Sequence, residues 1–129
     1  MIATDFRQWL ESIEGFPPTH YQHAAESPSK RFAWFIFSGS TLSAETLNIG
    51  EPPDTYYADL EIYDDDLEDL QETLDALLAR ADYRGTFGGG WIEDVLFEDQ
   101  RDDYVPQVDA DSIPQYFTFY RVTLTGYRA

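Results

Sequence analysis

The stretch Gln115–Tyr127, QYFTFYRVTLTGY, carries the longest alternating pattern in this chain of 129 residues. Successive side chains of a β-strand point to opposite faces, so alternate residues share a face. The pattern predicts a long two-faced strand, and the apolar run Trp91–Asp99 predicts its antiparallel hairpin partner. One face of the long strand is expected to carry Tyr116, Thr118, Tyr120, Val122 and Leu124, and the other to carry Phe117 and Phe119.

Two more strands are predicted earlier in the chain, at Arg31–Ser38 and Thr55–Tyr63. The later strand alternates apolar and polar residues, which predicts one buried and one solvent-exposed face. The earlier strand is apolar on both faces, which is typical of a central strand or of a strand with one face reserved for another subunit. Between them, the polar segment Gly39–Asp54 is longer than a usual hairpin loop. It is expected to form a protruding hairpin arm, with a flexible loop as the alternative.

Two amphipathic helices are predicted. The first, Asp5–Glu14, follows Thr4 as a good N-cap, and its apolar side chains recur at helical spacing. The second, Asp66–Ala81, has a stripe of leucines, and Asp65 is expected to cap it with Glu68 three residues on.

The predicted element order is therefore α-β-β-α-β-β, with a loop at His20–Lys30 and a turn at Asp82–Gly90. Hairpin pairing of the first strand with the second, and of the third with the fourth, gives an α+β fold. Its sheet is expected to be four-stranded and mainly antiparallel, with the helices packed on one face. The length of 129 residues predicts a single domain, residues 1–129.

The chain is strongly acidic, with 25 Asp and Glu against 8 Lys and Arg and a net charge of −17. Tight binding to nucleic acid or to an anionic membrane is therefore not expected, because both need a basic patch. The charge favours a basic protein surface, a cation, or DNA that passes without adhering, and simple solubility is the alternative. The start lacks a signal-peptide pattern and no apolar run is long enough to cross a membrane. A cytosolic or virion-assembled protein fits best.

Catalytic and cofactor motifs are not found in the sequence. There is no cysteine and no Gly-x-Ser-x-Gly, and Gly88–Gly90 is not followed by the helix and lysine of a phosphate loop. His20 and His23 are too few for most zinc sites, and neither Asp64–Asp66 nor Asp109–Asp111 has the spacing of a calcium loop. We therefore expect no enzyme activity, no cofactor and no metal site, with a small acidic enzyme or a Ca²⁺ module as a minor alternative.

Aromatic residues are more numerous than a one-layer core of helices on a sheet needs. Tyrosine and tryptophan are enriched at protein interfaces, although a packed aromatic core is the alternative reading. The acidic segment Asp99–Pro106, predicted to be a loop between the last two strands, is expected to bind as well as connect. The residues predicted to form an interface are Trp34, Phe35, Phe37, Asp99, Arg101, Asp102, Asp103, Tyr104, Tyr116 and Tyr120.

The run Asp99–Pro106, DQRDDYVP, followed by an acidic stretch and the strand Tyr116–Leu124, resembles a family of small phage and prophage tail proteins. In that family an acidic Asp-Asp-Tyr-Glu-Pro segment joins the last two strands, and Val105 stands here where the family often has Glu. The family is similar in fold and position to the tail terminator, or tail completion, proteins of long-tailed phages. The likeness covers most of the chain after Thr55, and the N-terminal half matches only in pattern.

The resemblance implies a non-enzymatic assembly protein of the virion tail, present in the host cytoplasm during assembly. Such proteins form a homo-oligomeric ring, commonly a hexamer, that caps the tail tube protein and meets the head-tail connector protein. The segment Glu98–Asp111 would lie at the rim of the ring, and an acidic bore would let DNA slide through. The alternative is an acidic DNA mimic or another acidic protein-binding module.

Overall fold

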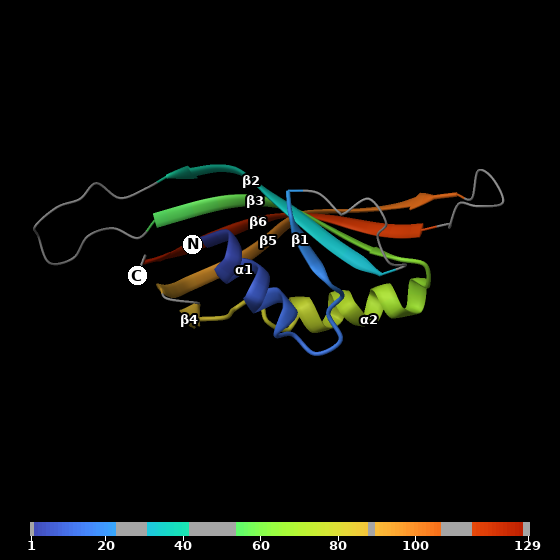
Figure 1. Cartoon of the computed structure of the whole chain (residues 1–129), viewed down its shortest axis with the longest axis horizontal. Helices are drawn as coiled ribbons and strands as arrows, with labels where there is room; N and C mark the ends of the chain where they lie inside the picture. Colours follow the sequence, from blue (N-terminus) through green and yellow to red (C-terminus); the bar gives the residue numbers. More distant parts are fainter. Residues whose placement is uncertain (1, 23–30, 42–53, 88–89, 107–114, 128–129) are drawn as a thin grey trace, which may run out of the picture.

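The computed structural model describes residues 2–22, 31–41, 54–87, 90–106 and 115–127. The elements are α1 (Ile2–Glu11), β1 (Thr19–Tyr21), β2 (Phe32–Thr41), β3 (Asp54–Asp64), α2 (Leu67–Leu78), β4 (Gly85–Phe87), β5 (Gly90–Val105) and β6 (Gln115–Tyr127). All six strands belong to one sheet in the order β1-β2-β3-β6-β5-β4 (Figure 1).

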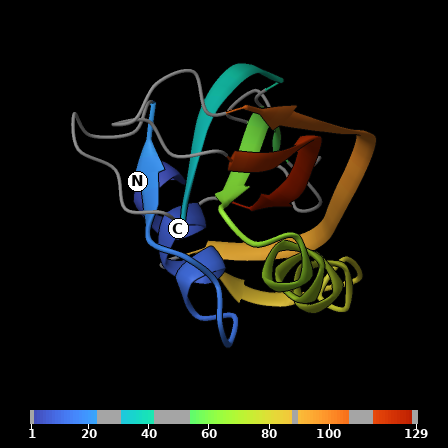
Figure 2. The ribbon, with the colours of Figure 1, turned by 90° about the vertical axis from the view of Figure 1, so that its right-hand side faces the viewer.

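The sheet is mixed and curved, and the predicted fold class is wrong. β1 pairs with β2 in parallel, and every other pair is antiparallel. The strands curl into a half-barrel, and the two short helices lie on its concave side (Figure 2). The protein is therefore mostly β, with six strands in place of the expected four-stranded sheet layered with helices.

Short edge strands account for part of the error. β1 lies partly in the predicted loop His20–Lys30 and β4 in the predicted turn Asp82–Gly90, and each is only three residues long. A strand of three residues shows too little alternation to be recognised in a sequence. The curvature follows from register shifts in β2 and β5, because each extra residue on one strand bends it and increases its twist.

Three of the four longer strands, β2, β3 and β6, are close to their predicted positions, whereas β5 continues past its predicted end at Asp99 to Val105. β6 has the predicted bounds, and the two hairpin pairings, β2 with β3 and β5 with β6, are confirmed. The predicted alternation of β3 is also confirmed, since Ala58, Leu60 and Ile62 are buried. Most of the predicted arm Gly39–Asp54 lies outside the described residues, as do His23, Asp109–Asp111 and residues 88–89 of the glycine run.

Both helices begin and end at residues other than those predicted. α1 runs from Ile2 to Glu11. It ends there because the next N–H groups, from Ser12 onwards, bond to carbonyls three residues back, and the chain then turns at Gly15, whose φ is +80°. α2 is capped by Asp66, whose carboxylate accepts from the backbone N–H of Asp69, so the prediction that Asp65 is the cap is wrong.

The core fills the concave side of the sheet. Phe6 of α1 meets Phe35 of β2 edge-on at 4.8 Å between ring centroids, and both side chains are fully buried. Leu70, Leu74 and Leu77 bring α2 to the same core. The inward side chains of β6 that join them include Tyr120, Val122 and Leu124, so the alternation of this strand organises the interior.

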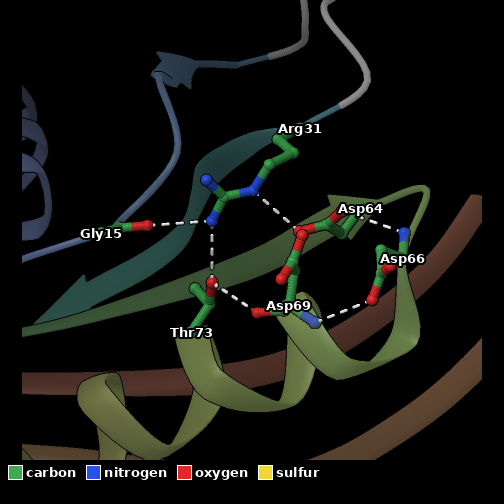
Figure 3. Close-up of polar contacts among 6 residues, drawn as sticks. All are labelled: Gly15, Arg31, Asp64, Asp66, Asp69 and Thr73. Atoms are coloured by element: carbon green, nitrogen blue, oxygen red, sulfur yellow. Dashed lines mark hydrogen bonds and ion pairs between the residues drawn. The ribbon is translucent and has the colours of Figure 1, made fainter.

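An arginine ties the helices to the sheet (Figure 3). Arg31 Nε donates to Asp64 Oδ2 at 2.8 Å, and its Nη2 donates to the Gly15 carbonyl at 2.9 Å and to Thr73 Oγ1 at 3.0 Å. The other oxygen of Asp64 accepts the Asp66 N–H at 3.0 Å, just before α2 begins. Asp64 is only 1% exposed, and burial raises the pKa of its carboxyl while Arg31 opposes the rise.

Replacing Arg31 with leucine should lower the free energy of unfolding by about 2–3 kcal/mol near pH 7, because a buried carboxylate loses its cation. The loss should shrink at acidic pH, as the carboxyl of Asp64 becomes protonated. Burial already raises the pKa of Asp64 and removing Arg31 raises it further, so the loss grows as pH rises through the pKa of this carboxyl. Urea unfolding near pH 7 and at an acidic pH measures the effect.

The matched control is Arg84→Leu. Its ion pair with Glu93 spans 2.9 Å, but 65% of the arginine side chain is exposed, so the loss should stay within about 0.5 kcal/mol at both pH values. The role assigned to Arg31 would be contradicted if the two variants lost the same free energy of unfolding. It would also be contradicted if the loss for Arg31→Leu did not depend on pH.

Candidate functional site

The acidic segment predicted to be a loop is the second half of a strand. β5 continues through Asp99 to Val105, and Arg101 to Val105 pair with Phe119 to Gln115 of β6. The prediction of a loop at Asp99–Pro106 is therefore wrong for most of its length, and the predicted rim segment Glu98–Asp111 is strand as far as Val105. We call residues 99–106 and 115–120 the β5–β6 arm.

A β-bulge at Asp99 and Gln100 explains why the strand was missed. These two residues together oppose Tyr120, and Asp99 adopts a left-handed φ of 55°. The extra residue reverses the alternation of β5, so that Asp102 faces the concave side and Arg101 faces the convex side. Because the segment is charged and its alternation reverses at the bulge, its sequence shows no continuous pattern of alternating apolar and polar residues.

The concave side of the β5–β6 arm carries a cross-strand polar row. Thr118 Oγ1 donates to Asp102 Oδ1 at 2.7 Å, and Tyr120 Oη donates to Gln100 Oε1 at 3.0 Å. Burial raises the pKa of Tyr120 to about 12, and the carboxylates of Asp102 and Asp75 add to the rise, so this hydroxyl remains a donor at neutral pH.

A groove runs between this row and α2. Its volume is about 680 Å³. The helix supplies one wall and the β5–β6 arm supplies the other, so the groove exists only because β5 continues past the bulge. The lining residues are Leu67, Leu70, Gln71, Leu74, Asp75, Leu78, Gln100, Asp102, Asp103, Tyr104, Tyr116, Phe117, Thr118 and Tyr120.

The convex side of the sheet carries aromatic rings and charges. Tyr63 stacks between Phe32 at 4.6 Å and Phe117 at 4.9 Å, and the Arg101 guanidinium lies 4.3 Å from the Phe119 ring centroid. These contacts run across neighbouring strands, so the rings form a continuous surface.

Glu61 lies within this convex surface. It accepts from Tyr63 Oη at 3.3 Å, and burial raises the pKa of its carboxyl. The same burial, together with the negative charge of Glu61, raises the pKa of Tyr63 to about 12. The aromatic surface therefore holds one partly desolvated carboxylate, with Arg101 as a nearby positive charge.

The residues predicted to form an interface separate into three environments. Phe35 and Tyr120 are buried in the core, at 0% and 2% exposure, and Phe37 packs against that core. Trp34 and Arg101 lie on the convex side, Asp103 borders both the convex surface and the groove, and Asp99 lies exposed at the bulge. Asp102, Tyr104 and Tyr116 line the concave groove.

Sequence reasoning missed the contribution of α2 to the groove. Leu67 and Leu78 are 45% and 41% exposed although they belong to the leucine stripe of this helix. The available signal was the width of the stripe, since Leu77 and Leu78 are adjacent and cannot both face one sheet.

Both edges of the sheet are largely uncovered in the described part of the chain. β4 pairs with β5 only at Gly90–Ile92, and β1 pairs with β2 only at Ala33–Phe35. Beyond these contacts, the β5 edge is acidic, whereas the β2 edge from Ile36 to Thr41 has no charged residue. The two edges thus differ in charge and offer unpaired backbone groups.

Metal centres and membrane-spanning helices are not found in the described part of the chain. Within the described ranges no group of three or more His, Asp or Glu side chains could hold a metal ion. Neither α1 nor α2 has the length and hydropathy to cross a lipid bilayer.

Comparison with known proteins gives a structural likeness without a family. No protein-family model and no curated protein sequence matches the chain. Among solved structures, the fold is similar to a chain in the virion of a native gene transfer agent particle. That match covers 97% of this chain and 91% of the other, with 10% sequence identity and a TM-score of 0.43. At these values the likeness carries no conclusion about function.

Replacing Asp99 with valine should lower the free energy of unfolding by about 2 kcal/mol, because a β-branched residue is strained at a left-handed φ. Asp99→Asn should be nearly neutral, since asparagine tolerates this conformation and the exposed pair with Arg121, at 3.7 Å, contributes little. Thermal or urea unfolding of the two variants measures the difference.

The control for side-chain chemistry is Asp103→Val, which places valine at an exposed, extended position of the same strand. Its stability should match or exceed that of the wild type, because valine favours strands. If both valine variants lose the same stability, the bulge does not depend on Asp99.

Proposed function

We propose that this chain is a non-enzymatic assembly protein of a phage-type tail that resembles tail terminators. In this proposal identical copies form a closed ring, a hexamer, that caps the tail tube and joins it to the head connector. The resemblance of Asp99–Pro106 to the acidic segment of that family supports the proposal, together with the acidic charge of −17. The virion tail would be its location after assembly.

The observation that carries the proposal is the pair of dissimilar sheet edges, which the described residues leave largely uncovered. A ring needs a heterologous contact, in which one surface of a copy meets a different surface of the next. Strand addition between an acidic edge and an uncharged edge meets this need, because backbone hydrogen bonds supply the attraction. Two acidic β5 edges repel each other, so the charge opposes symmetric pairing and favours head-to-tail closure.

The convex aromatic surface supports the same proposal. Trp34 is half-buried and Ile36 is 40% exposed beside the uncovered part of β2, so a neighbouring copy that adds a strand there also covers apolar area. An overall negative charge suits a ring through which DNA passes, since phosphates do not adhere to it.

The double variant Ser38→Glu with Ser40→Glu should stop ring formation, because it places acidic side chains on the β2 edge opposite the acidic β5 edge of the next copy. The wild-type chain should form a ring of defined mass at high concentration, measured by light scattering and by negative-stain images. The double variant should remain a folded monomer.

The matched control is Ser38→Lys with Ser40→Lys, which adds the same bulk with the opposite charge and should preserve the ring. Both serines are exposed, so neither variant should unfold the chain. A wild-type chain that stays monomeric at every concentration would contradict the proposal of a ring. Equal assembly by both variants would contradict pairing between the β2 edge and the β5 edge of the next copy.

A further inference from the structure

We propose that the groove between α2 and the β5–β6 arm binds an amphipathic helix of another protein, with a lysine or arginine of that helix seated between Asp75 and Asp102. The groove is the concave one described above, with a volume of about 680 Å³. This inference rests on the proposed function for the nature of the partner, which is then another component of the particle. Apolar contacts and a cation between two carboxylates would then hold that component on the ring.

The floor of the groove is apolar and remains partly open. Along α2, Leu67, Leu70, Leu74 and Leu78 follow helical spacing and line the groove. Leu70 and Leu74 are buried by the sheet, but Leu67 and Leu78 at the two ends are 45% and 41% exposed. On the opposite wall Tyr104 is 45% exposed, and its ring lies 4.8 Å from that of Tyr116. A second helix would cover these ends.

Acidic side chains stand on both walls of the groove. Asp75 projects from α2 and Asp102 from β5, and the negative charge of each adds to the raised pKa of Tyr120, which lines the same groove. Asp102 accepts from Thr118 at 2.7 Å and from Gln100 at 3.3 Å, and both donors are neutral. The described residues supply no ion pair to Asp75 or Asp102. A cationic side chain placed there would meet two carboxylates.

The length of α2 sets the length of a helix that can lie along the groove, at about three turns. α2 has 12 residues and is about 18 Å long at the usual rise of 1.5 Å per residue. A helix lying along it would present apolar residues at i, i+3, i+4 and i+7 to the leucine stripe, and basic residues flanking that face would reach the acidic walls.

The charge of this chain identifies the occupant as a different protein. The two helices of a second copy are unsuitable, because α2 has no basic residue and α1 has one, Arg7, between Asp5 and Glu11. The chain as a whole has 8 basic residues among 129. A basic amphipathic helix must therefore come from another polypeptide.

The probe is a synthetic helical peptide of about twelve residues with leucine at i, i+3, i+4 and i+7 and lysine on the flanking positions. Its fluorescence anisotropy is followed on titration with the full chain at low and moderate salt. We expect saturable binding that weakens as salt increases, and no binding of a matched peptide with glutamate in place of lysine.

Two pairs of variants locate the binding. Asp75→Asn with Asp102→Asn should weaken binding about tenfold, whereas Asp82→Asn with Glu98→Gln, which removes the same charge elsewhere on the surface, should change it less than about twofold. Leu78→Ser should weaken binding about fivefold, whereas Leu96→Ser, an equally exposed leucine on the convex side, should leave it unchanged.

Equal weakening by the two acidic pairs would show non-specific attraction and overturn the inference. Dissociation of the ring by Leu78→Ser would also overturn it, because the groove would then hold a second copy. The Ser38→Glu, Ser40→Glu variant separates the two proposals: binding of the lysine peptide by this monomer supports the groove alone. A wild-type ring without peptide binding supports the ring alone and overturns the groove.

Discussion

The fold depends on the register in which β6 pairs with β3 on one side and β5 on the other. Every second side chain of β6 enters the core, so a slip of one residue would expose Tyr120, Val122 and Leu124 together. β3 matches this strand without interruption, whereas β5 matches it only through its bulges. The bulge at Asp99 thus keeps β5 paired with β6 while exchanging which of its residues face the concave side. The groove, the polar row and the free acidic edge all follow from that exchange.

Strands could be predicted from the sequence where they are long and have one buried face. Gln115–Tyr127 and the alternation of Thr55–Tyr63 could be predicted because the period of two is unbroken. Strands could not be predicted from the sequence where contacts with a distant part of the chain decide the structure. Three-residue edge strands exist only because a longer strand pairs with them, and the charged half of β5 is a strand only because β6 continues beside it.

The candidate site was predictable in composition but not in arrangement. The run from Asp99 to Tyr104 is unusually acidic in the sequence, yet its side chains divide between two faces that no pattern in the sequence separates. Asp75 could not be associated with Asp102 in advance, because their proximity requires α2 to cross beneath the β5–β6 arm. Burial likewise could not be read from residue type, since Leu77 is fully buried and the adjacent Leu78 is 41% exposed.

Acidic charge has two physical effects on this surface. On the β5 edge it opposes the uncontrolled strand pairing that exposed backbone groups invite, at little expense to a fold whose core lies elsewhere. In the groove it is carried by Asp75 and Asp102, which stand on the two walls among apolar side chains and can attract a cation. Repulsion at the edge and attraction in the groove are therefore compatible in one molecule. The first excludes like-charged partners, and the second selects a partner that is basic and apolar at once.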